Sequence, residues 1–258
     1  MIALLAAARD KTARFGAEAQ ALGLVLVRAL RAGPSMRMSD FVEQLGRVAL
    51  SALPLVGIAS LFAGMVIALQ SSLQLAELGQ SHLVPDIVAV SLVRELAPVF
   101  TALLMSGKAG AGLASELGMV SLSGQAQAMR ALSLDIDREL VAPRVWACVW
   151  GTFLLTIASM LLGMLGGMVL GAGELGLSWV HYMNHVVDAL GPIDFAVGLL
   201  KSLGFGLLIA LFGVRFGLRD KADAAALGRH TMTAVVVASF VVLIADHVFT
   251  VFILAVLG

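Results

Sequence analysis

The sequence predicts an all-α membrane protein, on the evidence of its composition and of five long apolar segments. Of its 258 residues, 60% are hydrophobic and 13% are charged, and the mean hydropathy is +0.98. Soluble domains carry about 25% charged residues, so a soluble fold would expose too much of this apolar surface to water. Because a helix of about 20 apolar residues spans a bilayer, we expect a single membrane domain over residues 1–258.

The five expected spans define a transmembrane region over residues 48–257. The first contains Pro54, which membrane helices tolerate when neighbouring groups bond the freed backbone carbonyl. The third contains Gly163, Gly167 and Gly171 at steps of four residues, a small-residue ridge that allows close backbone approach. We therefore expect the third span to pack against another helix. The spans cover about residues 48–69, 86–107, 145–170, 193–214 and 232–257.

Two further segments have the pattern of amphipathic helices outside the hydrocarbon core. Residues 10–32 mix arginines with large apolar residues, which is too charged to span the bilayer but suits a helix in the headgroup layer. Between the second and third spans, over residues 109–143, apolar residues recur at helical spacing among charged ones. The spacing of Met129, Leu132, Ile136 and Leu140 predicts an amphipathic helix outside the bilayer in this stretch.

The basic residues lie in alternate connections between the expected spans. Fifteen of the seventeen Lys and Arg residues precede the first span, separate the second from the third, or separate the fourth from the fifth. Because Lys and Arg mark cytoplasmic loops, we expect the N-terminus in the cytoplasm and the C-terminus outside. The other two basic residues, Arg94 and Lys201, lie within spans.

Four charged residues lie away from the ends of the expected spans: Arg94, Glu95, Lys201 and Asp246. An uncompensated charge in the bilayer costs on the order of several kcal/mol. Counted from the outer ends of their spans at about 1.5 Å per residue, Arg94, Lys201 and Asp246 lie roughly 12, 14 and 18 Å deep. These depths predict a neutral cluster that joins the second, fourth and fifth spans. Two interpretations stay open: a structural lock between helices, or a polar lining for a lipid headgroup or a moving gate.

The other polar patterns do not predict chemistry within the chain. The segment Gly107–Gly112 lacks the Ser or Thr after lysine, and the earlier glycine, that a P-loop needs. His181 and His185 lack an acidic third ligand at a recognised spacing, and Cys148 is the single cysteine. Zero net charge gives no overall basic field for nucleic acid. We therefore expect no cofactor, no metal, no nucleic-acid partner and no catalysis in this chain.

Four motifs in the middle of the chain carry a resemblance to a known family. They read LVRELAP from Leu92, GKAG from Gly107, ASELGM from Ala114 and VAPR from Val141. They resemble RELGPV, GRxG, AEIGxM and a segment ending in PR in the MlaE/YrbE permeases, which are membrane subunits of ABC transporters that work with MCE-domain proteins. Lys108 stands where this family has arginine, which keeps the charge and loses the bidentate geometry.

The resemblance implies a homodimeric permease of the bacterial inner membrane, with a cytoplasmic N-terminus and a periplasmic C-terminus. The implied partners are an MlaF-like ABC ATPase that binds ATP and Mg, an optional MlaB-like STAS-domain protein, and a periplasmic MlaD-like MCE-domain protein. The implied activity is the ATP-driven movement of phospholipid between the inner membrane and the MCE partner, in the maintenance of outer-membrane lipid asymmetry.

The resemblance also implies two groups of site residues. A coupling helix between the second and third spans, over about residues 118–140, would contact the ATPase, and a cavity between two copies would hold the lipid. The coupling residues would be Glu116, Gly118, Met119, Gln125, Met129, Leu132 and Ile136. The cavity would be lined by Met65, Leu69, Gln70, Leu73 and Phe249.

A membrane carrier of another class is the main alternative to the ABC permease. An ion- or proton-coupled carrier would use Arg94, Glu95, Lys201 and Asp246 as a relay. It predicts transport that responds to pH or membrane potential without any ATPase. A third hypothesis, an intramembrane enzyme, lacks a catalytic group in this sequence.

Overall fold

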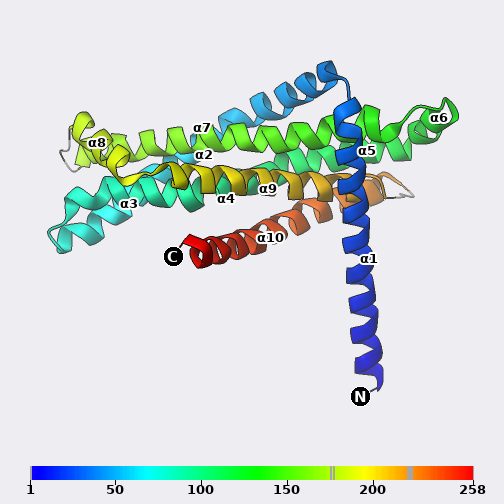
Figure 1. The fold of residues 1–258 in the computed structure, drawn as a ribbon, viewed down its shortest axis with the longest axis horizontal. Coiled ribbons are helices and arrows are strands. Elements are labelled where there is room, and N and C mark those ends of the chain that lie inside the picture. Colours follow the sequence, from blue (N-terminus) through cyan, green and yellow to red (C-terminus); the bar gives the residue numbers. More distant parts are fainter. Residues whose placement is uncertain (1, 175, 177, 220–222, 258) are drawn as a thin grey trace.

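Long helices lie side by side in a bundle, and the N-terminal helix crosses this bundle near one end (Figure 1). The computed structural model describes residues 2–174, 176, 178–219 and 223–257, and these ranges contain no strand. The helical elements are α1 (Ile2–Ala32), η1 (Gly33–Ser35), α2 (Met38–Glu77), η2 (Ser81–Leu83), α3 (Val84–Ser91), η3 (Leu92–Leu96), α4 (Ala97–Met105), η4 (Ser106–Gly110), α5 (Ala111–Leu122), α6 (Gln125–Ala131), η5 (Asp137–Val141), α7 (Ala142–Glu174), α8 (Trp179–Ala189), α9 (Pro192–Gly217) and α10 (Ala224–Leu257).

Several consecutive elements join into continuous helical segments. Five such segments are long and apolar enough to cross a membrane, which confirms the predicted fold class. Each begins earlier than hydropathy predicted, and the first two extend furthest beyond the expected spans. The added turns of the first carry charged pairs such as Arg47 with Glu43, which is why an apolarity pattern identifies only the middle of the helix. The five segments are Met38–Glu77, Ser81–Leu122, Asp137–Gly173, Pro192–Gly217 and Ala224–Ile253.

The connection between the second and third spans differs from the single helix expected over residues 118–140. The second span continues to Leu122, so residues 109–122 belong to it. Gly124 then has a φ of +75°, a backbone conformation that glycine adopts at little cost and that ends a right-handed helix. Only the short helix α6 follows, and Ser133 has a φ of +58° before η5 begins. The prediction of one continuous amphipathic helix is therefore wrong.

The helix predicted for residues 10–32 is confirmed as α1, and it lies crosswise to the bundle (Figure 1). Glu18 pairs with Arg215, 3.3 Å between Oε2 and Nε, and also with Arg219. The Trp146 indole donates a hydrogen bond of 3.4 Å to the Ala29 carbonyl. These contacts hold α1 against α7 and α9 in the orientation that a helix in the headgroup layer needs; its position in a membrane stays a prediction.

The third span packs closely against the first, as the glycine ridge predicted. A Cβ atom added to Gly64 would lie 1.9 Å from the Gly163 carbonyl oxygen, and one added to Gly166 would lie 2.0 Å from the Leu61 carbonyl oxygen. Small residues therefore let the backbones of α2 and α7 touch. Between the two helices, the hydroxyls of Ser60 and Ser159 lie 2.7 Å apart.

The other two glycines of the ridge make their closest contact with α8. A Cβ atom at Gly167 or at Gly171 would lie 2.7 Å from the Tyr182 side chain, which is buried against α7. Burial raises the pKa of the Tyr182 phenol above its usual range, so the ring stays neutral. One ridge on α7 thus positions both α2 and the short helix α8.

Candidate functional site

Lys201 is at the centre of an intramembrane charge cluster. Its side chain is 1% exposed. Its Nζ donates hydrogen bonds of 2.6 Å to Glu95, 3.0 Å to Asp246 and 2.7 Å to the Thr250 hydroxyl. An ammonium group has three donors, so these contacts satisfy all of them. The cluster joins η3 of the second span to α9 and α10, the three spans that its depth predicted.

Arg94 does not join the Lys201 cluster, contrary to the expectation of one group of four charges. Its Nε donates to a carboxylate oxygen of Asp194, in the first turn of α9. Asp194 is only 7% exposed and also accepts a 2.7 Å hydrogen bond from the Gly191 N–H. The long arginine side chain reaches towards the end of its span, as such side chains do in membranes. The four residues are therefore divided between two ion-paired groups.

The two adjacent charges lie in a wider helical turn. In η3 the hydrogen bonds span five residues, and the Ala97 N–H donates to the Leu92 carbonyl. Pro98 follows, and it has no N–H to donate to the Arg94 carbonyl. Such π-turns often occur at functional sites. The LVRELAP motif thus supplies both the charges and the irregular backbone turn that carries them.

The residues predicted to contact an ATPase differ in exposure. Met119 is 53% exposed and Leu132 is 73% exposed. Gly118 is buried within α5, so it packs inside the chain instead of facing a partner. Glu116 pairs with Arg144 at 3.1 Å. Gln125 is also exposed, whereas Met129 and Ile136 are half-buried.

The residues predicted to line a lipid cavity lie on two different helices. On α2, Leu69, Gln70 and Leu73 are exposed and Met65 is half-buried. On α10, the Phe249 ring packs edge-on against Phe205, with 6.4 Å between ring centroids. Helix α10 stays in contact with α9 and η3 as far as Thr250, which accepts a hydrogen bond from Lys201 and donates one to Glu95.

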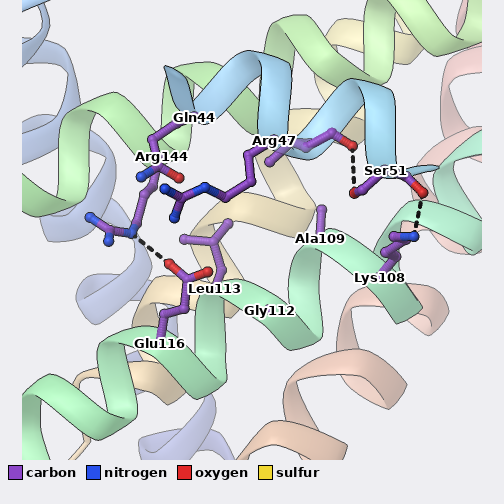
Figure 2. Close-up of a pocket in the computed structure, with 10 residues that line it drawn as sticks. Gln44, Arg47, Ser51, Lys108, Ala109, Gly112, Leu113, Glu116 and Arg144 are labelled. Carbon is purple, nitrogen blue, oxygen red and sulfur yellow. Dashed lines mark hydrogen bonds and ion pairs between the residues drawn. The ribbon is translucent and has the colours of Figure 1, made fainter. Parts of the chain in front are cut away.

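A polar cavity lies where α2, the second span and the start of α7 meet (Figure 2). Lys108 extends from η4 and donates to the Ser51 carbonyl. The carbonyl that Pro54 leaves without an N–H donor is that of Leu50, the preceding residue, so the expected bond from a neighbouring group to the freed carbonyl stays a prediction. No sequence pattern pointed to this cavity, or to Asp194 or Thr250, because charges and hydroxyls are common near helix ends.

The family model described as Permease MlaE matches residues 41–252, a stretch that begins three residues into the first span and ends one residue before the end of the fifth. The chain belongs to the MlaE permease family. The match confirms the family that the four sequence motifs indicated. The whole of α1 precedes the matched residues, so this crosswise helix lies outside the family match.

Three relatives of this MlaE-family chain are similar along most of its length. It is 31% identical over 217 residues, 84% of each chain, to a probable ABC transporter permease protein of Rickettsia prowazekii. It is 32% identical over 205 residues to a probable ABC transporter permease protein of Synechocystis, covering 80% of this chain and 78% of the relative. It is 29% identical over 231 residues, 88% of each chain, to the intermembrane phospholipid transport system permease protein MlaE of Haemophilus influenzae.

Proposed function

We propose that this chain is the permease subunit of an ABC transporter that moves phospholipid between the inner membrane and a periplasmic MCE-domain partner. The observation that carries the proposal is the family match across the five membrane helices, together with a relative named for intermembrane phospholipid transport. The transporter would contribute to outer-membrane lipid asymmetry. An MlaF-like subunit would bind ATP and Mg and hydrolyse the ATP, with an MlaB-like STAS-domain protein beside it.

The assembly we propose is a homodimer with its lipid cavity between the two copies. Helix α10 supports this arrangement because it is little buried within one chain and exposes large apolar side chains, among them Phe240, Ile244 and Phe252. The exposed residues of α2 and the partly buried Phe249 of α10 would then line opposite parts of one cavity. The distribution of basic residues supports a cytoplasmic N-terminus and a periplasmic C-terminus.

We assign the intramembrane charges a structural part in this transporter. Lys201 pairs with Glu95 and Asp246, and Arg94 pairs with Asp194. Compensated charges of this kind are retained at lower cost than free ones, and they link the second, fourth and fifth spans. The alternative of an ion-coupled carrier would use the same charges as a relay and would transport without an ATPase.

The direct test is transfer of a fluorescent phospholipid between two vesicle populations, with the full complex reconstituted in one of them. The proposal expects transfer that requires ATP and stops with a non-hydrolysable ATP analogue. Which population gains the label gives the direction of transport. Transfer driven by a proton gradient in the absence of an ATPase would refute the proposal and support the carrier.

Leu132→Asp is expected to reduce co-purification of the ATPase subunit by about tenfold or more. Leu132 is 73% exposed beside α6, and a charge in the apolar centre of an interface costs on the order of 2 kcal/mol or more. Immunoblotting of the ATPase in affinity-purified complex measures the effect. Gly118→Trp is a poor probe of docking, because its effect would begin with the packing of α5.

Leu78→Asp is the matched control for Leu132→Asp. Leu78 is 71% exposed and lies just after α2, at the opposite end of the bundle from α6 (Figure 1). The ATPase should co-purify with this variant at the unsubstituted level. Equal losses in the two variants, or none in either, would show that the coupling segment is placed wrongly.

A further inference from the structure

The polar cavity near Lys108 has an excess of positive charge. It has a volume of about 160 Å³ and is lined by three cationic side chains, Arg47, Lys108 and Arg144, and by one carboxylate, Glu116. One water needs roughly 10–15 Å³ of such volume, so the space admits a group several times larger than water. Three separate helical segments supply the cations: Arg47 from α2, Lys108 from η4 and Arg144 from α7.

The two arginines extend towards one another across one end of the cavity, and Lys108 lies at the other end (Figure 2). Arg47 pairs with Glu43 at the rim, and Arg144 donates to Glu116 and to the Leu140 carbonyl. A guanidinium carries five N–H donors and an ammonium three. The contacts in the structure therefore use only part of the donor capacity that these cations bring to the cavity.

The backbone is irregular where it presents Lys108. Residues of η4 form a π-helical turn between α4 and α5, and such a turn redirects a side chain within an otherwise regular helix and is common at functional sites. Here it brings Lys108 to the same cavity as the arginines. Cations that line one cavity repel each other, and a bound anion between them would offset this electrostatic repulsion.

We propose that this cavity binds a phosphate monoester or diester, with Arg47 and Arg144 as the principal ligands. An arginine guanidinium can donate two parallel hydrogen bonds to the oxygens of one phosphate group. Lys108 adds a point charge at the other end of the cavity. The orientation in the proposed function places this cavity at the cytoplasmic headgroup layer, so the ligand is a lipid headgroup or a soluble phosphate compound. The location rests on that proposed function, whereas the binding does not.

The test is thermal unfolding of the purified full-length protein in detergent micelles containing dioleoyl phosphatidic acid. A ligand that binds only the folded protein raises the unfolding temperature with concentration, here by about 5 °C or more at roughly 100 times its dissociation constant. Diolein, which has the same acyl chains without the phosphate, is expected to give no shift. Sodium phosphate without added lipid is the second probe. A shift with phosphatidic acid alone identifies a lipid headgroup site, and a shift with both identifies a site for phosphate groups in general.

Two substitutions with opposite expected effects locate the binding. Arg47→Gln should weaken phosphatidic acid binding roughly tenfold or more, because it removes charged hydrogen bonds, and it should fold because Arg47 is 57% exposed. Glu116→Gln should strengthen binding several-fold, because it removes the carboxylate and frees donors of Arg144. Arg31→Gln is the control, with the same charge change on an exposed residue of α1.

Three outcomes would overturn the proposal. They are the absence of a shift with either phosphate probe, an equal loss of affinity in Arg47→Gln and Arg31→Gln, and weaker binding in Glu116→Gln. The assay contains no ATPase and no transport step. Its failure would therefore leave the lipid-transfer test of the proposed function unaffected.

Discussion

Lys201→Met is expected to lower the free energy of unfolding by about 3 kcal/mol or more, because it leaves carboxylates without their cation inside the membrane region. Lys201 is 1% exposed and bonds to Glu95 and Asp246. Methionine nearly matches its length, so the change removes the charge without leaving a large cavity. Thermal unfolding of the detergent-purified protein, followed by intrinsic fluorescence, measures the loss.

A triple variant distinguishes the loss of pairing from a general packing defect. Adding Glu95→Gln and Asp246→Asn to Lys201→Met removes the uncompensated carboxylates, and it is expected to recover most of the lost stability. A buried ion pair can often be replaced by neutral groups at small cost. If the triple variant were as unstable as Lys201→Met alone, the three charges would not form the lock described here.

Gly64→Ala is expected to have a comparable effect, a loss of about 3 kcal/mol or more, by forcing α2 away from α7. The added Cβ atom would lie 1.9 Å from the Gly163 carbonyl oxygen, far inside a van der Waals contact. Backbone cannot yield as a flexible side chain does, so the overpacking cost is at or above the usual range of about 1–3 kcal/mol. Size-exclusion chromatography after a heating series measures the surviving folded protein.

Gly46→Ala, in the same helix, is the matched control for Gly64→Ala. A Cβ atom at Gly46 meets nothing within 4 Å, and alanine favours an exposed helix over glycine by up to about 1 kcal/mol. This control is therefore expected to be as stable as the unsubstituted protein or more so. A similar loss in both variants would show that alanine acts through the helix α2 itself and not through its contact with α7.

The sequence predicted the helical elements well where apolar composition determines that a helix forms. It predicted them less well where backbone geometry determines where a helix ends. Five spans and the helix before them follow from runs of apolar residues and from charge spacing. The continuous helix over residues 118–140 failed because a periodic pattern continues through Gly124 and Ser133, whereas their positive φ angles break the helix. The π-turns at η3 and η4 also leave no mark in a hydropathy pattern.

The sequence predicted three of the four expected members of the charge cluster and placed the fourth, Arg94, wrongly. Depth along the spans brings Glu95, Lys201 and Asp246 together, because each helix advances by a fixed rise per residue. Depth does not give the direction of a long side chain, and so Arg94 was assigned to the wrong group. Its partner Asp194 lies at the start of α9, where an acidic residue is ordinary at a helix N-terminus.

The most direct test of the proposed permease is to purify the tagged protein from its native membrane in mild detergent and to identify the bound proteins and lipids by mass spectrometry. We expect an ABC ATPase and an MCE-domain protein in stoichiometric amounts, together with phospholipid enriched above the bulk membrane. Recovery of the chain alone, with lipid in bulk proportions, would contradict the proposal that it is the permease subunit of a lipid transporter.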